Sequence, residues 1–105
     1  MNIETDYVGV SFELSKPVGL MKWSEAIAAE WSEGWRVPNR WELVRLFDDA
    51  TDSGHEFKDD TTVWSASPYH SDPDCAWLVG FYSGSSGAHN KSLRYVVRLV
   101  REIEK

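Results

Sequence analysis

The sequence contains a single cysteine, Cys75, among its 105 residues. One thiol can form neither an intramolecular disulfide nor a zinc site built from several thiolates, and this suits a reducing compartment. Long apolar runs are missing too, because no stretch approaches the roughly 20 residues that a membrane helix needs. The N-terminus carries Glu4 and Asp6 where a signal peptide has a basic start and an apolar segment. We therefore expect a cytoplasmic protein without a membrane partner.

Basic residues are fewer than acidic ones. The chain has 11 lysines and arginines against 17 aspartates and glutamates, a formal net charge of −6. This balance disfavours direct binding to nucleic acid and favours a partner with a basic or mixed-charge surface. The length fits one domain over residues 1–105 with a single hydrophobic core, and no internal repeat or linker divides it.

The motifs of common catalytic and metal sites are also absent from the sequence. It has no nucleophile elbow, no His-Glu-x-x-His helix and no phosphate-binding glycine loop. Cys75 lies next to Asp72 and Asp74, which would raise the pKa of its thiol and make it a poor nucleophile. The histidines occupy separate polar stretches and are not expected to form a metal triad; they are His55, His70 and His89. We therefore expect a non-enzyme that has no cofactor and no metal ion.

Apolar periodicity predicts two helices. Apolar residues at helical spacing predict the first helix over about 21–32, closed by Gly34. The second is expected to run from its N-cap, Asn39, to about Asp49. Glu42 stands at the N3 position and completes a capping box, which strengthens this prediction.

The other apolar patterns predict strands. Residues 7–14 alternate as a half-buried strand does, with Val8 and Val10 on the apolar face. Later strands are expected over residues 63–66, 76–82 and 93–100, with a turn at 84–87 and a polar loop over 48–62. Four tryptophans are expected to be mostly buried anchors of the core: Trp23, Trp35, Trp64 and Trp77.

Five short motifs follow one another along nearly the whole chain. They are GLMKWSEA at 19–26, GWRVPNRWEL at 34–43, VWSA at 63–66, AWLVGF at 76–81 and YVVRLVR at 95–101. In this order they resemble the Legionella collagen-like (Lcl) C-terminal domain family, a domain of unknown function. Asn39 stands where the family pattern has a threonine and preserves a helix cap, and Ala66 stands for a serine. Leu99 replaces a cysteine and so removes a disulfide that the pattern allows.

The resemblance implies a fold. The Lcl C-terminal domain is similar to C-type-lectin-like domains and to the formylglycine-generating, sulfatase-modifying group. It therefore implies a compact α+β fold of the C-type-lectin-like kind, with two helices packed beside a twisted antiparallel sheet. Formylglycine generation needs a pair of cysteines, which Cys75 alone cannot supply, so the likeness to that group concerns architecture.

The resemblance also implies a role for the arginine of the second motif. In such a fold Arg36 would lie in the core near Arg98 and Arg101, where both helices meet the last strand. We expect Arg36 to bind backbone carbonyls or a carboxylate and to stack on Trp35 or Trp41, rather than to bind a ligand. The residues expected to stabilise the fold are Trp23, Trp35, Arg36, Asn39, Glu42, Trp64, Trp77 and Arg98.

The acidic residues are concentrated in residues 48–74. This segment has eight acidic residues against one lysine, a local net charge of −7, whereas the rest of the chain has a net charge of +1. In a lectin-like architecture this insertion would lie on the ligand-facing side, where loops carry recognition. The predicted partner-binding residues are Asp48, Asp49, Asp52, Glu56, Asp59, Asp60, Tyr69, His70, Asp72 and Asp74, with Phe57 as a further apolar anchor.

We interpret the chain as a non-catalytic module that binds a protein with a basic surface through residues 48–74. If that surface normally binds DNA or RNA, the carboxylates would mimic the phosphate backbone. A small acidic protein of one domain fits the profile of inhibitors that phages and other mobile elements encode against nucleic-acid-binding host defences. The simplest alternative is a solvated loop that has no partner.

Three other interpretations remain open. The domain could bind a carbohydrate or another small ligand, with or without calcium at Asp72-Pro73-Asp74, although no Asn-Asp pair follows Trp77 as a calcium-dependent lectin would need. It could be a subunit of a larger receptor-binding assembly. It could also self-associate by pairing the acidic region with a basic C-terminal cluster, Lys91, Arg94, Arg98, Arg101 and Lys105.

Overall fold

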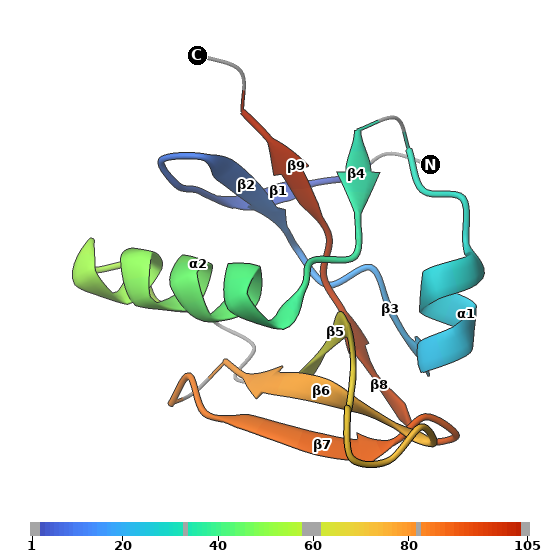
Figure 1. The fold of residues 1–105 in the computed structure, drawn as a ribbon. Helices are drawn as coiled ribbons and strands as arrows, with labels where there is room; N and C mark the ends of the chain where they lie inside the picture. Colours follow the sequence, from blue (N-terminus) through green and yellow to red (C-terminus); the bar gives the residue numbers. More distant parts are fainter. Residues whose placement is uncertain (1–2, 33, 58–61, 82, 104–105) are drawn as a thin grey trace.

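The computed structural model describes residues 3–32, 34–57, 62–81 and 83–103. These residues form two helices and nine strands, and the strands are divided between two sheets (Figure 1). The four-stranded sheet has the order β1 (Thr5–Val8), β2 (Phe12–Ser15), β9 (Val100–Glu102) and β4 (Trp35–Arg36). The five-stranded sheet has the order β3 (Gly19–Lys22), β8 (Arg94–Val97), β5 (Thr62–Pro68), β6 (Cys75–Gly80) and β7 (Ser86–Asn90).

The chain is therefore α+β with two helices, as predicted, but the expectation of one antiparallel sheet is wrong. Neighbouring strands are antiparallel except for β5 and β8, which pair in parallel at Val63 and Val96. The last apolar segment, residues 93–100, divides into β8 and β9, which belong to different sheets. Arg98 and Leu99 lie between these strands, where the Leu99 amide donates to Ser15 Oγ over 2.8 Å.

The first predicted strand is a hairpin. The chain turns at residues 9–11, where the Gly9 amide donates to the Phe12 carbonyl over 2.8 Å. Val8 and Val10 are 60% and 68% exposed, so their expected place on a buried face is wrong. The apolar alternation continues through the turn, and periodicity alone could not reveal the change of direction.

The second helix, α2 (Arg40–Asp52), begins as predicted. Asn39 Oδ1 accepts from the Glu42 amide over 2.9 Å, and the Glu42 carboxylate accepts from the Asn39 amide over 2.8 Å. Both bonds of the predicted capping box are therefore present. The helix continues to Asp52 instead of ending near Asp49, so part of the expected 48–62 loop is helical.

The first helix is shorter than predicted. It covers only Trp23–Ala28 (α1), because Met21 belongs to β3 and pairs with Tyr95 of β8. Ala29 is its C-cap, so Gly34 does not close it. Gly34 has a φ of +85° and turns the chain into β4. The expected turn at 84–87 is also shifted, since β7 begins at Ser86.

Two apolar clusters occupy the two faces of the five-stranded sheet. Val63 packs with Leu43 and Phe47 of α2, whereas its neighbour Trp64 packs with Ala26 of α1 on the opposite face. Trp64 is fully buried and Trp35 is 7% exposed, which confirms them as core residues. Trp23 and Trp77 are only half-buried, so they are weaker anchors than expected.

Candidate functional site

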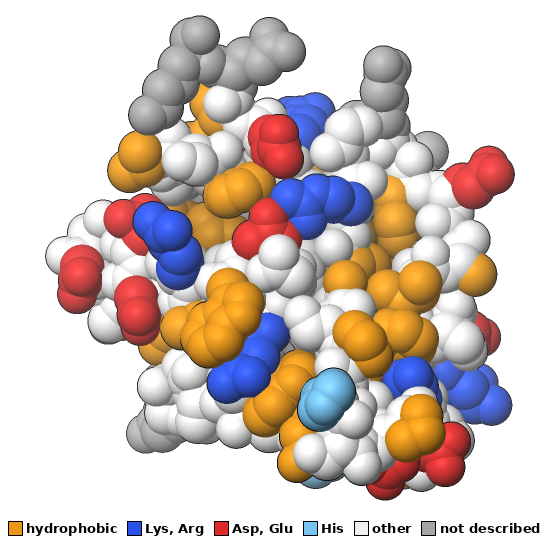
Figure 2. Space-filling model, viewed as in Figure 1, with side chains coloured by type: hydrophobic (Ala, Val, Ile, Leu, Met, Phe, Trp, Pro, Cys, Tyr) orange, Lys and Arg blue, Asp and Glu red, His pale blue; other side chains and the backbone are white. Residues whose placement is uncertain are grey.

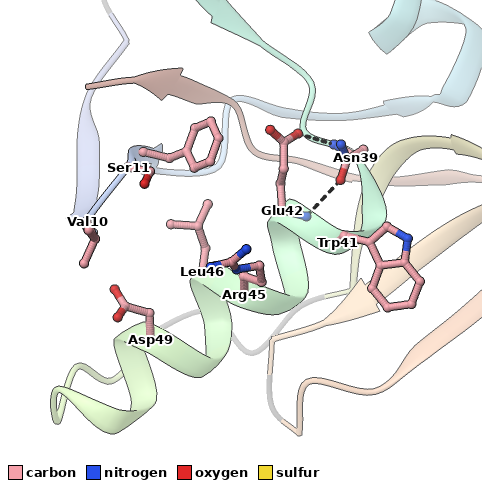
Figure 3. Close-up of a pocket in the computed structure, with 9 residues that line it drawn as sticks. Val10, Ser11, Asn39, Trp41, Glu42, Arg45, Leu46 and Asp49 are labelled. Atoms are coloured by element: carbon pink, nitrogen blue, oxygen red, sulfur yellow. Dashed lines mark hydrogen bonds between the residues drawn. The ribbon is translucent and has the colours of Figure 1, made fainter. Parts of the chain in front are cut away.

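A groove opens between α2 and the turn that joins β1 to β2 (Figure 3). Its volume is about 470 Å³, and ligand sites typically have about 300–1,000 Å³. Figure 3 shows Val10 and Ser11 on one side of it and Leu46 and Asp49 of α2 on the other. Two segments that are distant in the sequence therefore form its walls.

One wall of the groove comes from successive turns of α2. Glu42, Arg45 and Asp49 are three and four residues apart and so lie on one face of the helix. Leu46 lies on this face at 4% exposure, and together with Phe12 of β2 it gives the groove an apolar floor. The helix thus presents polar groups above an apolar base.

Two large apolar side chains at the groove are exposed. Val10 is 68% exposed at the tip of the hairpin, and Trp41 is 63% exposed at the first turn of α2. Trp41 cannot face the core because it is out of phase with the buried Leu43 and Phe47. Exposed apolar groups beside a groove are typical of interaction sites.

The carboxylate of Asp49 is oriented by a phenol. Tyr7 Oη donates to Asp49 Oδ2 over 2.6 Å, and this hydrogen bond raises the pKa of Tyr7 above its usual value. The other carboxylate oxygen, Oδ1, has no hydrogen bond to a described residue. Asp49 can therefore accept a hydrogen bond from a ligand without losing its own support.

Glu42 is held by Arg36 at the other end of the groove. The two guanidinium nitrogens of Arg36 donate to the two carboxylate oxygens over 2.7 and 2.5 Å. Partial burial alone would raise the pKa of Glu42, but the hydrogen bonds from Arg36 and from the Asn39 amide outweigh burial and lower it. The prediction that Arg36 binds a carboxylate is confirmed.

The expected environment of Arg36 is wrong. Its side chain is 44% exposed and lies near the ring of Phe12, 5.8 Å from the centroid, instead of on Trp35 or Trp41. Successive side chains of a strand point to opposite faces, so Trp35 enters the core while Arg36 points outward. Arg101 lies over Trp35 instead, at 4.6 Å.

Arg98 is the buried arginine of the core. Its side chain is 1% exposed, and Nη1 donates to Asp6 Oδ2 over 2.7 Å and to the Ser15 carbonyl over 3.1 Å. The guanidinium also lies near the rings of Phe57 and Phe81, at 5.1 and 5.2 Å. Its structural role agrees with the sequence expectation.

The acidic region is not one continuous loop. Asp48, Asp49 and Asp52 belong to the end of α2 and Glu56 follows them, whereas Tyr69, His70, Asp72 and Asp74 lie at the turn between β5 and β6. Figure 1 places these two groups at opposite ends of the molecule. The extended strand β5 carries the chain from one to the other. The predicted Asp59 and Asp60 lie outside the described residues.

Two predicted anchors are already engaged within the fold. Phe57 packs against the core, with its ring centroid 4.8 Å from that of Phe81. Tyr69 packs edge-on against Trp77 at 5.0 Å. His70 is exposed. Phe57 is therefore unsuited to serve as a surface anchor.

The basic cluster expected near the C-terminus is not a free surface. Arg94 pairs with Glu25 at 3.1 Å, Arg98 with Asp6, and Arg101 with Glu13. Lys91 lies over the Trp23 ring at 4.4 Å, and its ammonium group donates to the Pro73 carbonyl. Lys105 lies outside the described residues. Four of the five residues of this cluster therefore already have partners within the fold.

By contrast, acidic residues at the end of α2 have no ionic partner among the residues that the structure describes. Asp48, Asp52 and Glu56 are exposed, and no described lysine, arginine or histidine forms an ion pair with them. Figure 2 shows acidic side chains gathered over this end of the helix. Acidic groups are unfavourable at a helix C-terminus, which already has a partial negative charge.

The described residues offer little to covalent or metal chemistry. Partial desolvation and the neighbouring Asp72 raise the pKa of the Cys75 thiol, which reduces its reactivity. No group of three or more metal-ligating side chains occurs among the residues that the structure describes. Neither described helix has the length and apolar character that a membrane crossing requires.

A family model for the Lcl C-terminal domain matches residues 14–101. The chain belongs to this family. A comparison with curated proteins finds no match. The match to the Lcl C-terminal domain includes all of α2 but not Val10, Ser11 or Phe12, so the groove has one wall inside the matched region and one outside it.

Sequence analysis missed the groove of this Lcl domain. The sequence pattern places Val10 on a buried face and does not indicate Trp41 or Arg45 as site residues. The phase of Trp41 relative to Leu43 and Phe47 was a usable signal that its side chain faces outward. Nothing local in the sequence indicates that the hairpin tip lies against α2.

Proposed function

We propose that this Lcl domain is a non-catalytic binding module that holds a basic segment of a protein partner in the groove between α2 and the hairpin tip. The observation that carries the proposal is that exposed apolar side chains, Val10 and Trp41, line the groove together with Asp49, a carboxylate that has no ionic partner among the described residues. The apolar groups supply affinity, and the carboxylates select the charge of the partner.

The apolar part of the groove suits one aliphatic or aromatic side chain of a partner. Phe12 and Leu46 form its base, and Val10 stands at its edge with most of its surface in water. A side chain that enters would remove these groups from solvent, and burial of apolar area is the main favourable term in association. A wholly polar ligand would leave this contribution unused.

The charged part of the groove suits a lysine or an arginine. Asp49 lies at the rim, and Asp52 follows it one helical turn later on the same side. Asp48 and the partial negative charge of the helix end strengthen the field there. A partner cation would relieve the repulsion among these groups, so the affinity should fall as salt is added.

The proposal is tested with a display library of random peptides selected against the wild-type domain. We expect enrichment of peptides that combine a basic residue with an apolar one. Val10→Ser should weaken their binding by about tenfold, and its matched control is Leu20→Ser, which alters a 62% exposed residue of β3. Asp52→Lys should weaken binding and reduce its salt dependence, whereas Glu30→Lys, beyond α1, should not.

Three results would contradict the proposal. They are the absence of any enriched peptide, enrichment of acidic peptides, and binding that Val10→Ser and Asp52→Lys leave unchanged. Retention of the domain on immobilised glycans, with the same sensitivity to Val10→Ser, would identify the groove as a carbohydrate site instead.

A narrower form of the proposal concerns the identity of the partner. If the basic segment belongs to a nucleic-acid-binding protein, the carboxylates of Asp48, Asp52 and Glu56 would take the place of phosphates, and the domain would act as an inhibitor. The exposure of these carboxylates and the absence of an ion pair to any described residue support it. We expect DNA or RNA to displace the domain from such a partner; simultaneous binding of both would exclude mimicry.

A further inference from the structure

Arg40, the first residue of α2, lies between two indole rings. Its guanidinium carbon is 4.4 Å from the ring centroid of Trp41 and 3.8 Å from that of Trp77 on β6. Tyr69 packs edge-on against the outer part of this stack, 5.0 Å from Trp77. Figure 2 shows a basic side chain between hydrophobic ones near the N-terminal end of α2.

Arg40 and Arg45 are the two arginines that form no ion pair with a described residue, and of these two Arg40 is the one that lies against aromatic rings. Arg36, Arg94, Arg98 and Arg101 each form an ion pair with a carboxylate, but Arg40 forms none with a described residue. Its Nε is buried without a hydrogen-bond acceptor, and no side-chain hydrogen bond from Arg40 to a described residue exists. A guanidinium group has five N–H donors, and the protein is rich in carboxylates that could accept from them. With no partner among the described residues, the terminal donors of Arg40 therefore remain free to bind a ligand.

The stack determines which part of Arg40 a ligand can reach. The two rings cover the faces of the guanidinium group, and Nε is buried, so the two terminal nitrogens form the accessible edge. Such an edge can donate two parallel hydrogen bonds to a flat oxyanion. Because the rings already fix the side chain, binding would cost little conformational entropy. The positive end of the 13-residue helix adds to the attraction.

We propose that Arg40 is an anion-binding anchor that takes a carboxylate of the segment bound in the groove. The claim that this carboxylate belongs to a segment bound in the groove rests on the proposed function, whereas the anion site itself does not. Trp41 lines the groove and also covers Arg40, so one ligand can contact both. The segment would place its anionic end at Arg40 and its cationic end near Asp49 and Asp52, which fixes its direction along α2.

The anion site is tested by NMR on the isolated domain with sodium acetate as the probe and sodium chloride at equal ionic strength as the reference. We expect acetate to cause saturable shifts of the Arg40 Nε–H signal and of the Trp41 and Trp77 indole signals. Arg40→Gln should abolish the indole shifts. Arg94→Gln should retain them, because Arg94 is exposed, lies outside the groove and has no ring contact among the described residues.

Several outcomes would contradict the proposal that Arg40 binds a carboxylate. Equal shifts with chloride, or indole shifts that persist in Arg40→Gln, would show that no oxyanion site exists at this residue. Saturation by inorganic phosphate but not by acetate would assign the site to a different ligand. If Arg40→Gln fails to fold, Arg40→Lys serves in its place, since it keeps the charge but loses the two-donor edge and should weaken acetate binding by about tenfold.

A peptide selected for the groove separates this inference from the proposed function. Replacing the acidic residue of the peptide by its amide should weaken binding to the wild type by about tenfold but leave binding to Arg40→Gln unchanged. Equal weakening in both would overturn the anchor while leaving the groove intact. If acetate binds saturably but the library yields no peptide, the anion site is supported and the proposed function is contradicted.

Discussion

At the scale of single residues, the tightest constraint is a glycine in the loop before β7. Gly84 has a φ of +75°, and a Cβ at this position would lie 2.8 Å from Cδ2 of Phe47. Phe47 itself packs among the rings of Phe57 and Phe81, so it has little freedom to move. Both the backbone and the packing therefore require glycine here.

Gly84→Ala should lower the free energy of unfolding by about 1–3 kcal/mol, because it forces a methyl group into a filled core and an alanine into the left-handed region. Urea denaturation followed by tryptophan fluorescence measures the loss. Gly87→Ala is the matched control, since a Cβ there meets no atom within 4 Å and the backbone of β7 is extended. Equal stability of Gly84→Ala and the wild type would mean that Phe47 can be displaced freely.

At the scale of elements, the sequence predicted those features that depend on residues close in the chain. The capping box of α2 lies within four residues, and both of its bonds are present. The Arg36–Glu42 pair spans six residues and was anticipated as a contact with some carboxylate. The hairpin at residues 9–11 is an exception, because β1 pairs with the neighbouring β2 while the apolar alternation continues through the turn and conceals the change of direction.

The pH dependence of α2 should reveal Glu42. Its pKa is lower in the folded protein than its usual value of about 4.3. Its ionised form therefore stabilises the fold above that usual pKa, and this contribution is lost as the pH falls through the lower folded value. We expect Glu42→Gln to be less stable than the wild type at neutral pH, with a difference that shrinks in acid.

Thermal unfolding at a series of pH values checks this expectation. The control is Glu30→Gln, an exposed residue without a described ion pair, which should follow the wild type throughout. A stability difference for Glu42→Gln that stays constant from neutral to acidic pH would show that the Arg36 and Asn39 contacts do not depend on ionisation.

At the scale of the whole molecule, the sequence indicates the family and the α+β class but not the division into two sheets. The groove and the Arg40 stack escaped prediction for the same reason. Each joins segments that are far apart in the chain: Val10 lines the groove opposite Asp49 (Figure 3), and Arg40 packs against Trp77. Periodicity reports which side of an element is apolar, but it does not report which other element lies there.

The buried Arg98 links the two sheets, and its loss should affect the whole fold. It lies between β8 of one sheet and β9 of the other, and it binds Asp6 of β1 and the Ser15 carbonyl of β2. Arg98→Met retains the apolar length of the side chain but leaves Asp6 without its cation. Breaking a buried ion pair by removing one partner should cost about 3 kcal/mol.

Arg94→Met is the matched control, because it breaks the exposed pair with Glu25 and should cost less than about 1 kcal/mol. Chemical denaturation of both variants, followed by circular dichroism and by tryptophan fluorescence, measures the two costs. If Arg98 couples the sheets, the two probes should give one transition for the wild type and separate midpoints for Arg98→Met. Equal losses for the two variants, with coincident transitions, would mean that the apolar clusters alone hold the sheets together.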